Sequence, residues 1–228
     1  MTRKMIFPLL FGIVGVGILV SLGIWQVQRL AWKEGVLAHI RQEIVKPPVP
    51  LDIDAPGIAH QKYKSVSISG RLTGQEIHVL IGTDRMGNGF RVISRLETAK
   101  GPILVDLGFL PEKWKDTPPR KGKITVIGNI LWPEEYDWFT PEPDLKANIW
   151  FSRDLPKMAA HLKSRELLVV VRSVTPPLAH VTPLPVDTSG IPNNHLNYAI
   201  TWFLLAIGWL GMTVYWLWRI RRRLTENS

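Results

Sequence analysis

Two long apolar runs lie near the ends of the chain, and a segment of mixed polarity separates them. Met5 to Trp25 and Tyr198 to Trp218 are each 21 residues long and carry no charge. At about 1.5 Å per residue each run makes a helix of roughly 31 Å, enough to cross the roughly 30 Å hydrocarbon core of a bilayer. The runs therefore predict two transmembrane helices. Two buried core helices are the alternative, but a domain of this size has no core thick enough for such rods.

The first run has a second interpretation, a cleaved signal peptide. It is long for the apolar part of a signal, and no clear A-x-A cleavage site follows it, so a membrane anchor is favoured. No Arg- and Ser-rich mitochondrial presequence precedes Met5, which favours a bacterial plasma membrane.

Charge indicates the orientation of the two spans. The net charge is +9, but residues 46–197 hold 19 Lys and Arg against 16 Asp and Glu, so most of the excess flanks the apolar runs. This distribution is typical of membrane topology and argues against a nucleic-acid partner. The tail, with Arg219 and Arg221–Arg223, is predicted to be cytoplasmic, and two spans place the N-terminus on the same side. Arg29 and Lys33 argue weakly against this, although long segments translocate largely regardless of charge.

The middle segment opens with a predicted helix and continues with β structure. Residues 26–45 are good helix formers, and the helix ends at the prolines of Lys46–Gly57. A short helix is expected at 155–164. Alternation and turn signals predict strands at 64–72, 76–82, 89–97, 102–110, 123–131, 148–154 and 167–173. The fold class is thus a membrane protein of α+β type, with two transmembrane helices flanking a mostly antiparallel sheet or small barrel.

The predicted organisation follows from these elements. It comprises a cytoplasmic N-terminus at 1–4, a span at 5–25, an extracytoplasmic domain at 26–197, a span at 198–218 and a cytoplasmic basic tail at 219–228. The extracytoplasmic domain comprises a helical extension at 26–45, a β-rich core at 58–174 and a tether at 175–197.

Few residue patterns in the chain suggest catalysis. The chain has no cysteine and no phosphate-binding, nucleophile-elbow or zinc-protease motif, so we expect no enzymatic activity. The six histidines include no pair at helical spacing for a metal. His78 and His161 are interpreted as solvated or hydrogen-bonded structural residues.

Two stretches next to the spans suggest a ligand. In "LGIWQVQRLAWK", Trp25, Arg29 and Trp32 fall on one helical face, and Lys33 follows. They form either an interfacial aromatic belt with a snorkelling arginine, or a surface on which a flat anionic ligand stacks and meets cations.

The second stretch, "IPNNHLNYAITWFLLA", opens the second span. Asn193 or Asn194 can cap the helix, which puts His195 in its first turn. There the helix dipole favours neutral imidazole, the form that binds iron. Tyr198 and Trp202 share its face at i+3 and i+7. A plain interfacial histidine is the alternative.

Together these two stretches resemble the hallmark ends of the surfeit-locus/Shy family, bacterial type, whose members are assembly factors of cytochrome c oxidase. "YKSVSISGRL", "GFRVISRLE", "ILVDLGFLPEKW" and "NIWFSRDLPKMA" extend the resemblance over nearly the whole chain. One departure is "LVDLGFLP", where the family reads close to "LVNRGWVP": Asp106, Leu107 and Phe109 replace a polar, arginine and tryptophan set.

The resemblance implies that the chain binds haem a and aids its insertion into the largest oxidase subunit, with His195 as the implicated iron ligand. The isoprenoid tail of haem a is apolar and suits hydrocarbon, whereas its propionates are anionic and pair with cations. The haem a synthesis enzyme is a further expected partner, besides the lipid bilayer. A cofactor-free scaffold that holds an oxidase intermediate is the alternative. The expected cofactor-binding residues are Trp25, Arg29, Trp32, Lys33, His195, Tyr198 and Trp202.

Overall fold

The computed structural model describes residues 3–83 and 85–226. The chain divides into two compact units: Met1–His39 with Ser189–Ser228, here called the helical unit, and Ile40–Thr188, here called the β unit.

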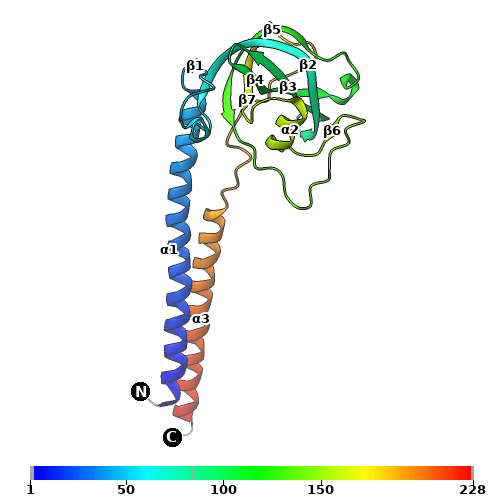
Figure 1. Cartoon of the computed structure of the whole chain (residues 1–228). Coiled ribbons are helices and arrows are strands. Elements are labelled where there is room, and N and C mark those ends of the chain that lie inside the picture. Colours follow the sequence, from blue (N-terminus) through cyan, green and yellow to red (C-terminus); the bar gives the residue numbers. More distant parts are fainter. Residues whose placement is uncertain (1–2, 84, 227–228) are drawn as a thin grey trace. The chain divides into compact units, whose positions relative to one another are not determined.

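Two long helices form the helical unit. Helix α1 (Arg3–Val45) has 43 residues and α3 (His195–Glu226) has 32. The prediction of two long apolar helices is confirmed, and residues 26–45 continue the first span as one helix. Figure 1 shows the two helices side by side and antiparallel, so the start of α1 lies beside the end of α3.

Small residues allow the two helices to approach closely. A Cβ atom added at Gly12 would lie 2.2 Å from Cγ2 of Thr213, and one added at Gly23 would lie 2.7 Å from the ring of Phe203. In hydrocarbon, helices associate through such close packing because apolar side chains gain nothing by leaving lipid. These contacts define the interface that we call the seam.

Away from the seam, apolar side chains point outward. Only 11% of the most apolar window of α1 and 6% of that of α3 are buried. Buried core helices would show the reverse, so that alternative is wrong. Both helices are long and apolar enough to cross a membrane, and their outer faces suit lipid.

The β unit is built on a seven-stranded sheet. Its strands are β1 (Val49–Pro50), β2 (Ser65–Thr83), β3 (Gly87–Thr98), β4 (Gly101–Pro111), β5 (Lys121–Leu131), β6 (Ile149–Trp150) and β7 (Leu168–Thr175). Three short helices accompany them: η1 (Ile58–His60), η2 (Glu112–Trp114) and α2 (Leu155–Leu162).

The sheet closes on itself. Its order is β1-β2-β3-β4-β7-β5, and β5 pairs again with β2, so five strands form a small barrel. The pairs β2–β3, β3–β4, β2–β5 and β5–β7 are antiparallel, whereas β4–β7 is parallel. The mostly antiparallel prediction is confirmed.

Strand β2 corrects two of the predicted strands. The runs 64–72 and 76–82 form one strand of 19 residues. Its register shifts between Leu72 and Glu76, around Gly74 with φ +88°. The first half pairs with β5 and the second half with β3, so the bulge lets one strand bend around the barrel. The expected strand 148–154 is reduced to β6, two residues long.

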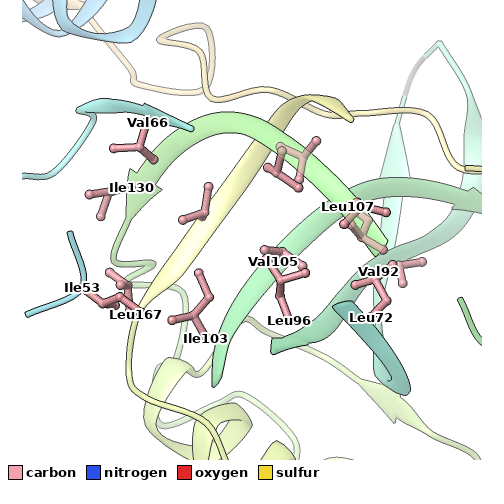
Figure 2. Close-up of a cluster of buried hydrophobic side chains, with 14 of the residues drawn as sticks. Ile53, Val66, Leu72, Val92, Leu96, Ile103, Val105, Leu107, Ile130 and Leu167 are labelled. Atoms are coloured by element: carbon pink, nitrogen blue, oxygen red, sulfur yellow. The ribbon is translucent and has the colours of Figure 1, made fainter. Parts of the chain in front are cut away.

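The barrel interior is the main core. Figure 2 shows Val66, Val92, Leu107 and Ile130 converging there from different strands. Outside the barrel, α2 packs Met158 and other apolar side chains on the sheet. The α2 helix begins where the side chain of Asp154 accepts a hydrogen bond from the N–H of Lys157, which is a typical N-cap.

The expected tether is attached to the β unit over most of its length. Thr182 exchanges two backbone hydrogen bonds with Phe109, at 2.7 and 2.9 Å. The ring of His180 stacks on Trp114 with centroids 3.7 Å apart. Residues up to Thr188 therefore belong to the β unit rather than to a free linker.

Candidate functional site

The candidate site lies where α3 begins. Asn194 takes the N-cap position, because its carbonyl accepts the first helical hydrogen bond, from the N–H of Tyr198 at 3.2 Å. His195 is the first residue of the helix and is half-buried. Its Nδ1 lies 2.8 Å from Oε1 of Gln26, a side chain of α1 that is only 8% exposed.

This contact determines which ring nitrogen of His195 is available. An amide oxygen only accepts hydrogen bonds, so the tautomer of His195 that makes this contact is the one protonated at Nδ1. In neutral imidazole the other nitrogen, Nε2, then holds a lone pair. Within the described residues Nε2 has no hydrogen-bond partner. The arrangement can donate an electron pair to a metal.

The structure brings only some of the predicted residues to the seam. At about 100° per residue, positions seven apart share a helical face, so Lys33 lies on the face of Gln26 and Trp202 on that of His195. Both side chains are half-buried.

The other predicted residues are exposed. Trp25, Trp32 and Tyr198 are exposed by 54, 52 and 56%. The guanidinium of Arg29 lies 4.0 Å above the ring of Trp32. Within the described chain no hydrogen bond or ring contact joins these side chains to His195.

Gln26 is the residue that sequence reasoning missed. The sequence pattern predicts it only as the start of a helical extension. A signal was present, because Gln26 is three residues after Gly23 and seven before Lys33, so a polar amide falls on the small-residue face of α1. An amide on such a face needs a partner.

The donor set limits the kind of metal group that fits. Among residues 3–83 and 85–226, no cluster of three or more His, Cys, Asp or Glu side chains can hold a bare ion. One imidazole is nevertheless enough for a metal that brings its own equatorial ligands, as a porphyrin does. The residues present therefore fit a haem and do not fit a free ion.

A second polar cluster lies in the β unit. The carboxylate of Glu76 accepts hydrogen bonds from Arg120 at 2.6 Å and from Nε2 of His78 at 3.2 Å. Burial acts to raise the pKa of Glu76, but the bond from His78 and the charge of Arg120 outweigh it, so the pKa lies below its usual value. The ionised carboxylate holds Arg120 and His78 in place, and this agrees with the interpretation of His78 as a hydrogen-bonded structural residue.

Asp106, one of the positions that differ from the family pattern, lies in another buried network. Asp106 is 0% exposed and accepts hydrogen bonds from Arg91 at 2.7 Å and Arg153 at 3.1 Å. Leu107 and Phe109 are also buried. The three substituted positions therefore serve the core of the β unit, with Arg91 and Arg153 supplying the cations.

Comparison with known proteins identifies the family. The model of the SURF1 family matches residues 13–207, which include both stretches at the ends of the spans. The chain belongs to the SURF1 family. Members of this family are known as assembly factors of cytochrome c oxidase.

Relatives in several eukaryotes agree with this assignment. A SURF1-like protein of Monosiga brevicollis is 28% identical over 218 residues, covering 86% of this chain and 82% of the relative. Surfeit locus protein 1 of Rattus norvegicus is 26% identical, covering 80% and 67%. Its human counterpart is 27% identical, covering 82% and 69%. The family resemblance is thus confirmed, and it covers nearly the whole chain.

Proposed function

We propose that this SURF1-family chain is a non-catalytic assembly factor that carries haem a for insertion into the largest subunit of cytochrome c oxidase. The observation that carries the proposal is the hydrogen bond between Nδ1 of His195 and Gln26, which leaves Nε2 as a lone-pair donor at the head of an apolar helix. A single axial imidazole is a common haem ligand. The haem a synthesis enzyme would be the source of the cargo.

The surroundings of His195 support haem a as the cargo. The outer faces of α1 and α3 offer apolar surface for an isoprenoid tail. Arg29 and Lys33 lie on the turns that follow Gln26 and offer cations for the propionates. Trp25, Tyr198 and Trp202 offer aromatic rings for the macrocycle, and Trp32 holds the guanidinium of Arg29.

We further propose a bacterial plasma membrane with both termini cytoplasmic and residues 26–197 outside it. The four arginines at 219 and 221–223 support this orientation, since basic residues flanking a span favour the cytoplasmic side. Alkaline phosphatase fused at Ser228 should be inactive, and the same reporter inserted after Gly87 should be active. An active C-terminal fusion would overturn the topology.

The test of haem carriage is purification of the full chain from cells that also make haem a. The wild-type protein should carry haem with a defined Soret band. His195→Ala should insert and fold normally, with a change in the free energy of unfolding within about 0.5 kcal/mol, but lose the haem, because the remaining contacts are apolar and less directional. His39→Ala, an exposed histidine on α1, is the matched control and should keep it. Full haem occupancy in His195→Ala with an unchanged band would place the ligand elsewhere.

Contacts to the propionates should matter less than the iron ligand. Arg29→Ala should weaken haem retention by about 1–3 kcal/mol, the range of a charge-assisted hydrogen bond, and Lys33 can partly substitute for it. Haem content equal to that of wild type in the Arg29→Ala, Lys33→Ala double variant would remove the propionate role.

A cofactor-free scaffold is the second candidate, and one loop of the β unit favours it. Trp138 and Phe139 are 82% and 71% exposed. Asp137 holds them in a turn by accepting hydrogen bonds from the N–H of Phe139 at 3.0 Å and the hydroxyl of Thr140 at 2.8 Å. Presented aromatic pairs of this kind suit a protein partner. If this loop is the main functional surface, Trp138→Ala with Phe139→Ala should lower oxidase assembly while His195→Ala leaves it intact.

A further inference from the structure

We infer that Gln26 is a positioning residue that holds His195 as the Nδ1-protonated tautomer and thereby selects Nε2 as the atom that meets the iron. The role of the iron rests on the proposed function. The tautomer is a property of the protein alone, so it can be tested without any haem.

Gln26 is buried where α1 packs against α3. Its side chain is 8% exposed and lies on the seam, three residues after Gly23. A buried amide without a partner is costly in free energy, so the side chain needs a hydrogen bond. The 2.8 Å contact with Nδ1 of His195 supplies it.

The atoms that meet set the direction of the hydrogen bond between Gln26 and His195. The atom of Gln26 that faces the ring is Oε1, which accepts hydrogen bonds. The proton must therefore lie on Nδ1 of His195. This hydrogen bond joins His195 to α1, the helix that packs against α3 at Gly12 and Gly23.

A hydrogen-bond partner on one ring nitrogen of a histidine affects how the other nitrogen binds a metal. Histidines that bind metals commonly donate their other N–H to a carbonyl or carboxylate, which orients the ring and raises its basicity. Loss of such a partner lowers metal affinity by about 10–100-fold. Gln26 occupies this position toward His195, although 169 residues separate them in the chain.

Two variants separate the contribution of the hydrogen bond from that of packing. Gln26→Leu removes the acceptor at similar volume, whereas Gln26→Glu keeps an acceptor and makes it anionic. Gln42→Leu, an exposed glutamine of α1 outside the seam, is the matched control.

The first measurement uses the full chain in detergent without haem. Nitrogen NMR of protein labelled at histidine, with the His195 signal assigned by its loss in His195→Ala, should report a proton on Nδ1 in wild type, Gln26→Glu and Gln42→Leu. Gln26→Leu should show a mixture of tautomers. A proton on Nε2 in the wild type, or no change in Gln26→Leu, would overturn the inference.

The second measurement titrates the same proteins with haem a. Gln26→Leu should bind about 10–100-fold more weakly, and Gln26→Glu should bind and lower the reduction potential of the iron because its partner is anionic. If wild type binds haem through His195 and Gln26→Leu matches it, the inference fails and the proposed function stands. If wild type shows the Nδ1-protonated tautomer but binds no haem, the proposed function fails and the positioning of His195 stands.

Discussion

The two units of this protein bury opposite kinds of surface. In the β unit, Leu104 and Leu168 are 0% exposed, and the apolar side chains converge inside the barrel and beneath α2. In the helical unit, Leu204 and Ile207 are 63% and 66% exposed. Both patterns follow from the same hydrophobic effect, because apolar surface leaves water in the first unit and has hydrocarbon available in the second.

Polar groups differ in a parallel way. The β unit buries charges in ion pairs, as Asp106 with Arg91 and Arg153, and Arg120 with Glu76. The seam of the helical unit instead contains an amide and an imidazole that are hydrogen-bonded to each other, those of Gln26 and His195. The difference indicates that the β unit uses buried charge for its own stability, whereas the helical unit keeps one polar contact at the site where a ligand is proposed.

The largest expected effect concerns the buried charges. Asp106→Leu should destabilise the full chain by about 3–5 kcal/mol, because Arg91 and Arg153 lose their shared carboxylate in a buried site. Thermal unfolding in detergent, followed by near-ultraviolet circular dichroism, measures the change. Glu134→Ala, which breaks the exposed pair with Lys62, should change stability by at most about 1 kcal/mol. Equal effects of the two substitutions would contradict the distinction between buried and exposed pairs.

The next effect compares two leucines directly. Leu104→Ala should destabilise the protein by about 2–5 kcal/mol, since it leaves a cavity in a packed core. Leu204→Ala should stay within about 0.5 kcal/mol because its side chain faces outward from the helix pair. The same unfolding measurement serves both variants. A loss at Leu204 as large as that at Leu104 would mean that this face of α3 is packed against protein.

An arginine substitution should be tolerated at an exposed leucine of the β unit but not at an outward-facing leucine of α3, which is the opposite of the result expected for the two alanine substitutions. Leu204→Arg should disfavour membrane insertion of α3 by about 2.5–3.5 kcal/mol, as expected for arginine within a span. Leu145→Arg places the same charge on an exposed leucine of the β unit and should be tolerated. The inserted fraction, measured by alkaline extraction of membranes, should fall only for Leu204→Arg. Normal insertion of that variant would remove the lipid-facing assignment.

The smallest expected effect is a dependence on pH in the β unit. Burial acts to raise the pKa of Glu135, but hydrogen bonds and charge from Arg153 outweigh it and lower the pKa below its usual value. A lowered carboxylate pKa stabilises the fold above the unfolded value of about 4.3 and loses that stability as the pH falls through the folded value. Thermal midpoints between pH 6 and pH 3 should therefore fall less steeply in Glu135→Gln than in wild type. Identical slopes would show that the pair contributes nothing.

Several features of this protein could be predicted from sequence alone. The length and lack of charge of Met5–Trp25 and Tyr198–Trp218 predict two long apolar helices, because a bilayer demands both properties of any span. Alternation along runs such as 89–97 and 102–110 predicts strands, since it reports which face of a strand is buried. Its place at a helix N-terminus, together with the family resemblance, makes His195 a candidate ligand.

Only the tertiary structure decided which segments meet. Local patterns say which face of an element is buried but not what lies against it. The pairing of β2 with both β3 and β5 depends on a bulge at Gly74 that alternation does not predict. Gln26 and His195 are 169 residues apart, and their contact depends on the register of α1 against α3, to which the close packing at Gly12, Gly15 and Gly23 contributes.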